Sequence, residues 1–229
     1  FEKFLQLISK NQKTKKELYT QAYSGLATVA ERRQNWLKAY KHLAQWLKLE
    51  PSNGQIYERM GRALFFLNKP EKAFSYFKKA TKYDDRINVP EINMGLLCTQ
   101  KNDAKNTLKW MKKALKNYPD LAKVRFQLAS WLFQQGAGKE AEKQANSAAS
   151  LGMSSQNLKI LQGLIAWELG KYEKAETFFK ELYLQLPGNF LVANFLALSL
   201  AEQKLKEKRQ RGLKLAMINF QLFPRNIEA

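Results

Sequence analysis

Apolar residues recur along this chain at spacings of three and four, which places them on one face of an α-helix. The pattern runs in two consecutive stretches, each long enough for one amphipathic helix, with a short polar turn between them. Gly61 of one unit corresponds to Gly95 in the next unit and to Gly163 three units after its own, so the period is 34 residues. The pattern therefore predicts a row of helical hairpins, each with a first (A) and a second (B) helix.

The register predicts five repeats of this kind and a sixth that is slightly longer. They are expected at residues 20–53, 54–87, 88–121, 122–155, 156–189 and 190–226. The last one fits only with about three extra residues in the basic turn Lys204–Lys208. The repeats account for nearly the whole chain.

Turn residues stand where this arrangement needs them. Pro70 falls in the first turn of a B helix, where its missing N–H does no harm. Gly136 and Gly170 are expected to end A helices in the left-handed conformation. Small residues such as Gly61 and Gly163 predict points where the two helices of a hairpin approach closely.

The sequence pattern of the repeat resembles that of the tetratricopeptide repeat (TPR) family. In that family, helix A carries Leu-Gly and an aromatic residue, and helix B carries Ala, Phe and Ala followed by a closing Pro. Met60–Gly61, Ala73, Phe77 and Ala80 carry this resemblance in one repeat. It implies an all-α fold, an α-α superhelix (right-handed solenoid) of about six helix-turn-helix repeats. It also implies a concave surface made by the A helices.

Two short flanks complete the expected organisation. Residues 1–19 predict an N-terminal flanking helix followed by a basic turn, Lys10–Lys16, because apolar residues occur at i, i+3, i+4 and i+7: Phe1, Phe4, Leu5 and Ile8. Residues 227–229 are interpreted as the start of a further, truncated repeat. Since no polar capping helix follows, we expect a fragment of a longer protein.

Composition narrows the possible chemistry. The chain has 229 residues with 39 Lys and Arg against 20 Asp and Glu, a formal net charge of +19, but only one Cys and one His. Cys98 is expected to be a buried small hydrophobe, and His42 an ordinary helix residue. The segment Gly136–Lys139 lacks the spacing of a phosphate-binding loop and is interpreted as a turn. We therefore expect no enzyme, no metal and no cofactor.

The resemblance assigns the partner site to the concave A-helix surface. Read position by position, this surface grades from a cationic end at Arg59 and Arg62 to an apolar end in the last repeats. It suits an apolar peptide or an amphipathic helix, whereas a chaperone-tail clamp is excluded by Glu58 and Gln127. The alternative is that these side chains form ordinary core. The candidate groove residues are Arg59, Arg62, Phe66, Ile92, Asn93, Leu96, Phe126, Gln127, Phe133, Ile160, Leu164, Trp167, Asn194 and Phe195.

A second candidate surface is basic and lies on B helices. Its residues are Lys78, Lys79, Lys82, Lys105, Lys109, Lys112, Lys113 and Lys116. The alternative is a plain solvated surface. Lys outnumbers Arg by 30 to 9, and no aromatic stacking platform is expected among these lysines, which makes nucleic acid an unfavoured partner.

Two functions remain open from the sequence. The first is a protein–protein interaction scaffold that binds a peptide or helix of another protein in the apolar groove. The second is a basic adaptor whose convex lysines bind an anionic membrane, a polyanion or nucleic acid non-specifically. No apolar stretch reaches the ~20 residues needed to span a bilayer. The bacterial cytoplasm and the cell envelope both stay open as locations, and neither a small-molecule substrate nor a particular oligomeric state is predicted.

Overall fold

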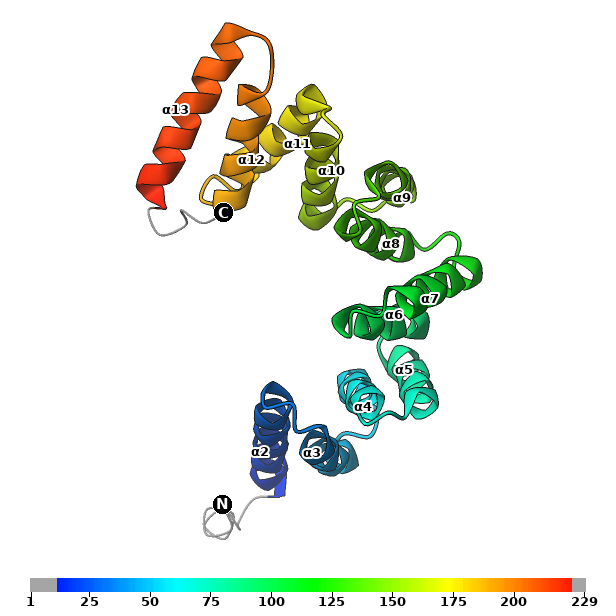
Figure 1. Cartoon of the computed structure of the whole chain (residues 1–229). Coiled ribbons are helices and arrows are strands. Elements are labelled where there is room, and N and C mark those ends of the chain that lie inside the picture. Colours follow the sequence, from blue (N-terminus) through cyan, green and yellow to red (C-terminus); the bar gives the residue numbers. More distant parts are fainter. Residues whose placement is uncertain (1–11, 224–229) are drawn as a thin grey trace. The chain divides into compact units, whose positions relative to one another are not determined.

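The structure is a computed structural model that describes residues 12–223, and every regular element in that range is an α-helix (Figure 1). The helices follow one another as pairs joined by short turns, which confirms the predicted all-α repeat architecture. They fall into two compact units that divide after Ala114.

Unit 1 contains three helix pairs. The A helix and B helix of each pair pack on each other, and α3 and α5 also contact the A helix of the following pair. Its helices are α2 (Gln12–Arg32), α3 (Trp36–Leu49), α4 (Gly54–Phe66), α5 (Pro70–Tyr83), α6 (Pro90–Gln100) and α7 (Ala104–Asn117), the last of which continues past the division after Ala114.

Unit 2 repeats this plan. The helices within each pair are in contact, α9 packs on α10, and α11 packs on α12. Its helices are α8 (Ala122–Gln134), α9 (Gly138–Ser150), α10 (Gln156–Glu168), α11 (Tyr172–Gln185), α12 (Phe190–Ala201) and α13 (Lys206–Leu222).

In three pairs, the two helices meet where the A helix has a glycine. A Cβ at Gly61 would lie 2.7 Å from the ring of Phe77, and one at Gly163 would lie 2.8 Å from the ring of Phe179. Real Cβ atoms essentially never come this close to another heavy atom, so only glycine allows the phenylalanine to reach the A helix. The predicted close approach is confirmed in both units.

A second regular position lies on the B helix, one step of 34 residues apart each time. These side chains have no exposed surface and are Ala39, Ala73, Thr107, Ala141 and Ala175. Thr107 is the exception in chemistry, and its buried hydroxyl donates to the Asp103 carbonyl oxygen at 2.9 Å. The hydrogen bond offsets the cost of burying a polar group at a position that otherwise takes alanine.

The turn between the A and B helices is built the same way in five repeats. A residue with positive φ, between 55° and 72°, occurs at every thirty-fourth position: Gln34, Asn68, Asn102, Gly136 and Gly170. The next backbone N–H donates back into the A helix, as from Lys171 to the Ala166 carbonyl at 2.8 Å. Such a bond closes a helix that ends in the left-handed conformation. The two glycines were predicted, whereas the side-chain-bearing positions were not.

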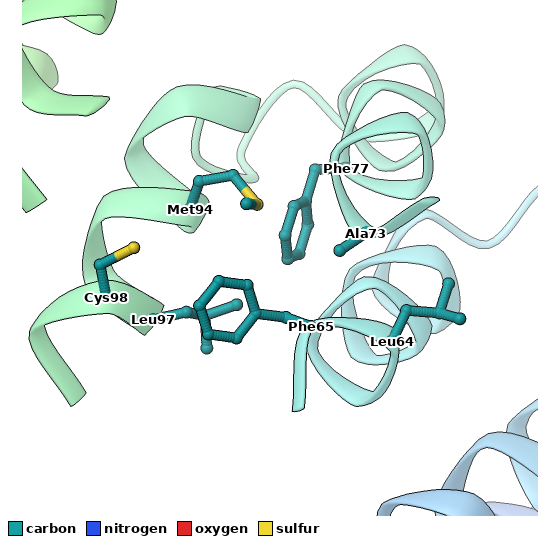
Figure 2. Close-up of a cluster of buried hydrophobic side chains, with 7 residues drawn as sticks. All are labelled: Leu64, Phe65, Ala73, Phe77, Met94, Leu97 and Cys98. Atoms are coloured by element: carbon teal, nitrogen blue, oxygen red, sulfur yellow. The ribbon is translucent and has the colours of Figure 1, made fainter. Parts of the chain in front are cut away.

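The core of unit 1 shows how successive pairs join (Figure 2). The ring of Phe77 extends from α5 toward Met94 of the next A helix, so the same phenylalanine fills its own pair and the following junction. The cluster draws on α4, α5 and α6 and consists of Leu64, Phe65, Ala73, Phe77, Met94, Leu97 and Cys98.

The predicted first turn is wrong. Helix α2 begins at Gln12, so residues 12–16 of the expected Lys10–Lys16 turn are helical. These residues include no Gly or Pro, and Lys and Gln are good helix formers, so nothing there stops the helix. Likewise α13 begins at Lys206, inside the expected Lys204–Lys208 turn. The flanking stripe at Phe1, Phe4, Leu5 and Ile8 and the segment 227–229 lie outside the described residues.

The close approach predicts a contrast between two glycines of unit 2. Gly163→Ala should destabilise the fold by about 1–3 kcal/mol, because the new methyl group overpacks against Phe179. Gly188→Ala, at a turn position with open space around it, should change stability by less than about 0.5 kcal/mol. Urea unfolding followed by circular dichroism measures both, and equal effects of the two substitutions would contradict the packing described here.

Candidate functional site

The apolar part of the candidate groove lies on the A helices of unit 2. Its members are all half-buried, with part of each side chain in the core and part exposed. We call these residues the apolar face: Phe126, Gln127 and Phe133 on α8, Ile160, Leu164 and Trp167 on α10, and Asn194 and Phe195 on α12. Helix α10 contacts both α8 and α12, so the three helices are neighbours.

Aromatic rings anchor this face to the core. Trp167 of α10 meets Phe195 of α12 edge to face, with ring centroids 5.5 Å apart. Phe195 in turn stacks on the fully buried Phe179 of α11 at 5.4 Å. Edge-to-face and offset-stacked contacts of this kind are favourable geometries for aromatic pairs. The exposed edges of Trp167 and Phe195 are therefore held in fixed positions by the ring beneath them.

Unit 1 treats the equivalent positions differently. Ile92 is 1% exposed and Asn93 is 6% exposed, so neither lines a surface, and their assignment to the groove is corrected. The Asn93 amide donates to the Asn88 carbonyl oxygen at 3.2 Å. Eight of the eleven residues of α6 are buried, and of the three candidates on this helix only Leu96 is exposed. The A-helix pattern alone could not predict this, because the neighbours of α6 cover nearly its whole circumference.

At the cationic end of the candidate groove, one of the two arginines is paired within unit 1. Arg59 forms a two-pronged ion pair with Glu31 of α2, with Nε–Oε1 at 3.0 Å and Nη2–Oε2 at 2.9 Å. Its Nη2 also donates to the Thr28 hydroxyl at 2.9 Å, and the guanidinium lies 5.4 Å from the Trp46 ring centroid. Arg59 therefore ties α4 to α2, and of the two arginines only Arg62 is exposed.

Phe66 is held by two neighbours. Its ring stacks on Trp36 with centroids 4.4 Å apart, and the Lys101 ammonium lies 5.6 Å from its centroid. The ring is half-buried at the end of α4. Of the six unit 1 candidates, Arg62 and Leu96 are the exposed ones, and they do not form a continuous apolar surface.

The basic residues on α5 and α7 are all exposed, and none of them forms an ion pair with another described residue. We call eight of them the lysine face: Lys78, Lys79 and Lys82 on α5, and Lys105, Lys109, Lys112, Lys113 and Lys116 on α7. Unit 2 differs, because several of its lysines contact carboxylates. Lys171 and Lys174 both bind Glu142, at 2.5 and 2.8 Å.

Aromatic rings do lie among these lysines, contrary to the expectation from the sequence. Phe74 and Trp110 are in contact, with centroids 5.2 Å apart. The ammonium groups of Lys78 and Lys113 lie 5.1 and 5.0 Å from the Phe74 centroid, and Lys113 is 4.9 Å from that of Trp110. The sequence did contain a signal for these lysine–aromatic contacts. Phe74 precedes Lys78 by four residues and Trp110 precedes Lys113 by three, and side chains at these spacings meet on a helix.

A cleft that the sequence analysis did not single out lies between α11, α12 and α13. It has a volume of about 360 Å³. Leu196 and Leu200 of α12 line it together with Leu184, Leu215 and Ile218. Leu184 is 77% exposed. Only the packing of the three helices brings these side chains together.

The remaining candidate chemistry has a structural explanation. Cys98 is buried, and this burial, followed by the nearby Asp103 carboxylate, raises the pKa of its thiol, so the group stays protonated at neutral pH. Within residues 12–223, no three His, Cys, Asp or Glu side chains gather as a metal site would require. No helix among the described residues is long and apolar enough to cross a membrane.

The paired helices with their 34-residue spacing define a helical-repeat protein. Two segments, residues 54–86 and 157–184, match the family model of the tetratricopeptide repeat. They contain the two glycine–phenylalanine contacts, Gly61 with Phe77 and Gly163 with Phe179. Two of its helix pairs therefore match the tetratricopeptide repeat, and the other pairs share their architecture.

Solved structures share this fold. Yeast Tom70 superimposes with a TM-score of 0.61 at 16% identity over 91% of this chain, which spans only 48% of the Tom70 chain. Pseudomonas aeruginosa pilF gives a TM-score of 0.57 at 18% identity and covers 93% of this chain and 96% of its own. YrrB, described as a TPR protein with an unusual peptide-binding site, gives 0.58 at 18% identity and covers 81% and 94%. A search of curated proteins found no match.

The Arg59–Glu31 pair predicts measurable coupling between α4 and α2. Arg59→Ala and Glu31→Ala should each destabilise unit 1, and the double substitution should cost less than the sum by about 0.5–3 kcal/mol. A double-mutant cycle by urea unfolding measures this difference. Strictly additive effects would mean that Arg59 is free to meet a partner, as the sequence first suggested.

Glu142 predicts a pH dependence in unit 2. Hydrogen bonds from Lys171 and Lys174 hold the pKa of its carboxyl below the ordinary value, so its stabilising effect is present above the unfolded-state pKa of about 4.3 and is lost as pH falls through the folded-state pKa. Replacing Glu142 by Gln should cost up to about 1 kcal/mol at neutral pH. The difference from the unchanged chain, measured by urea unfolding, should shrink toward pH 3. A difference independent of pH would contradict this assignment.

Proposed function

We propose that the chain acts as a protein-interaction scaffold, a role that its tetratricopeptide repeats support. We propose, more specifically, that the apolar face of unit 2 binds an apolar segment of a partner protein as an amphipathic helix. One observation carries the proposal. Large apolar side chains on three neighbouring A helices are left half-exposed in unit 2, whereas the equivalent candidates in unit 1 are mostly buried or paired.

The composition of the face fits such a partner. Rigid, partly buried aromatic residues such as Trp167 and Phe195 are the groups that contribute most to binding at protein interfaces. A helix presents apolar side chains at i, i+3, i+4 and i+7, a spacing suited to a row of half-exposed side chains on adjacent helices. Gln127 and Asn194 supply amide groups on the same helices and can hydrogen-bond the polar edge of the segment.

We expect burial of apolar surface, rather than attraction between charges, to drive this binding. None of the eight residues of the apolar face is ionisable. Association driven by apolar area responds weakly to salt, whereas association through exposed charges is screened. The description of YrrB as a peptide-binding TPR protein agrees with this mode, although at 18% identity its likeness concerns the fold. The proposal assigns no reaction to the chain.

Peptides selected from a random phage-displayed library on the full chain test this function. Enriched peptides should carry apolar residues at i, i+3 or i+4, and i+7. The double variant Trp167→Asp and Phe126→Asp should weaken their binding by at least about tenfold, because each carboxylate would be desolvated. Raising salt from about 0.05 to about 0.5 M should change affinity by less than about threefold.

Leu151→Asp is the matched control, since Leu151 is an exposed apolar residue of unit 2 outside the apolar face. It should leave peptide binding unchanged. Circular dichroism must show that the double variant keeps its helices. Loss of helical structure in that variant would mean that Trp167 and Phe126 are core residues, and equal loss of binding in the control would place the site elsewhere.

A further inference from the structure

The lysine face has an unusual charge pattern for a folded surface. Helix α7 carries five lysines and no carboxylate, and the only carboxylate on α5 is Glu71. Lys105, Lys109, Lys112 and Lys116 follow one another at i, i+4, i+7 and i+11, which is a single face of the helix. Like charges at such spacings repel and destabilise a helix, so fold stability does not explain their arrangement.

The rest of the molecule shows that this is not a general property of its lysines. In unit 2, Lys159 pairs with Glu181 and Lys208 pairs with Glu176. Some lysines of unit 2, on both A and B helices, therefore pair with carboxylates, while those of α5 and α7 take part in no ion pair between described residues. The eight residues of the lysine face therefore form a cluster of charges without an ion-pair partner among the described residues.

Three of the ammonium groups are held in place by aromatic rings. Lys78 and Lys113 both contact Phe74, and Lys79 lies 5.3 Å from the Tyr76 centroid. Side chains already held over a ring lose less freedom when they bind an anion. The same contacts cover Phe74 and Trp110 with lysine, so these rings do not offer a stacking surface for bases.

The shape and composition of the face favour a flat anionic partner. The four lysines in line on α7 span about 16 Å at 1.5 Å per residue, so they can meet one plane together. No large apolar side chain of α7 is strongly exposed, which leaves nothing to insert into a hydrocarbon layer. Lysine acts as a point charge and lacks the planar fork with which arginine reads bases and phosphates. Clusters of four to eight cations on an amphipathic helix are typical of binding to anionic lipid headgroups.

We propose that the lysine face docks unit 1 on the headgroups of an anionic membrane surface. The attachment is peripheral and electrostatic, without insertion of apolar side chains. It shares no residue with the apolar face, so its failure and that of the proposed peptide binding are distinguishable.

Co-sedimentation of the full chain with vesicles tests the proposal. We expect binding to phosphatidylcholine vesicles that contain roughly one third phosphatidylserine at about 0.05 M salt, little binding to pure phosphatidylcholine, and release at about 0.5 M salt. The triple variant Lys109→Glu, Lys112→Glu and Lys116→Glu should weaken binding at least about tenfold. No binding to the anionic vesicles at low salt would overturn the proposal.

A matched control separates this surface from net charge. The triple variant Lys139→Glu, Lys143→Glu and Lys204→Glu changes exposed lysines of unit 2 and alters the net charge equally. It should weaken binding by less than about threefold. Equal losses in both variants would show that overall charge alone is responsible and would overturn the proposal.

Two further outcomes are decisive. If duplex DNA or polyglutamate binds as tightly as the anionic vesicles and depends on the same lysines, the partner is a polyanionic chain and not a membrane. If the α7 variant loses helical structure, the neutral variant Lys109→Gln, Lys112→Gln and Lys116→Gln replaces it, and full retention of vesicle binding in that variant contradicts the proposal.

Discussion

The close packing of an A helix on its B helix, seen most sharply where a glycine meets a phenylalanine, is the constraint on which the hairpins depend. Gly61 admits Phe77 and Gly163 admits Phe179, and in each case even a methyl group would collide with the ring. Phe77 then reaches on to Met94 of the following A helix, so a single side chain closes one hairpin and joins it to the next (Figure 2). The residues that make this contact occupy equivalent positions of the 34-residue repeat.

With the hairpins closed in this way, the outward side of each A helix is left to the local environment. In unit 2 it keeps a half-exposed apolar face, supported from below by the stack of Trp167, Phe195 and Phe179. In unit 1 the same positions are used for cohesion, since Ile92 is buried and Arg59 is paired with Glu31. One repeat pattern therefore produces two surfaces of different chemistry.

The B helices show the same division through charge. In unit 2, several lysines form ion pairs with carboxylates, as Lys171 and Lys174 do with Glu142. In unit 1 the lysines of α5 and α7 contact aromatic rings instead, and a ring polarises toward a cation without cancelling its charge. Part of the positive charge of the chain is thus concentrated on α5 and α7.

The sequence by itself determined whatever depends on neighbours three, four or thirty-four residues away: the helix pairs, the glycine contacts and the turns at Gly136 and Gly170. It predicted the side chains of the apolar face, but their exposure was decided by packing between helices. The tertiary structure alone decided that Arg59 meets Glu31, that Ile92 and Asn93 are buried, and that Lys113 reaches Phe74 on another helix. These outcomes depend on contacts between residues some thirty or more positions apart or on how fully a helix is covered, and neither leaves a periodic signal along the chain.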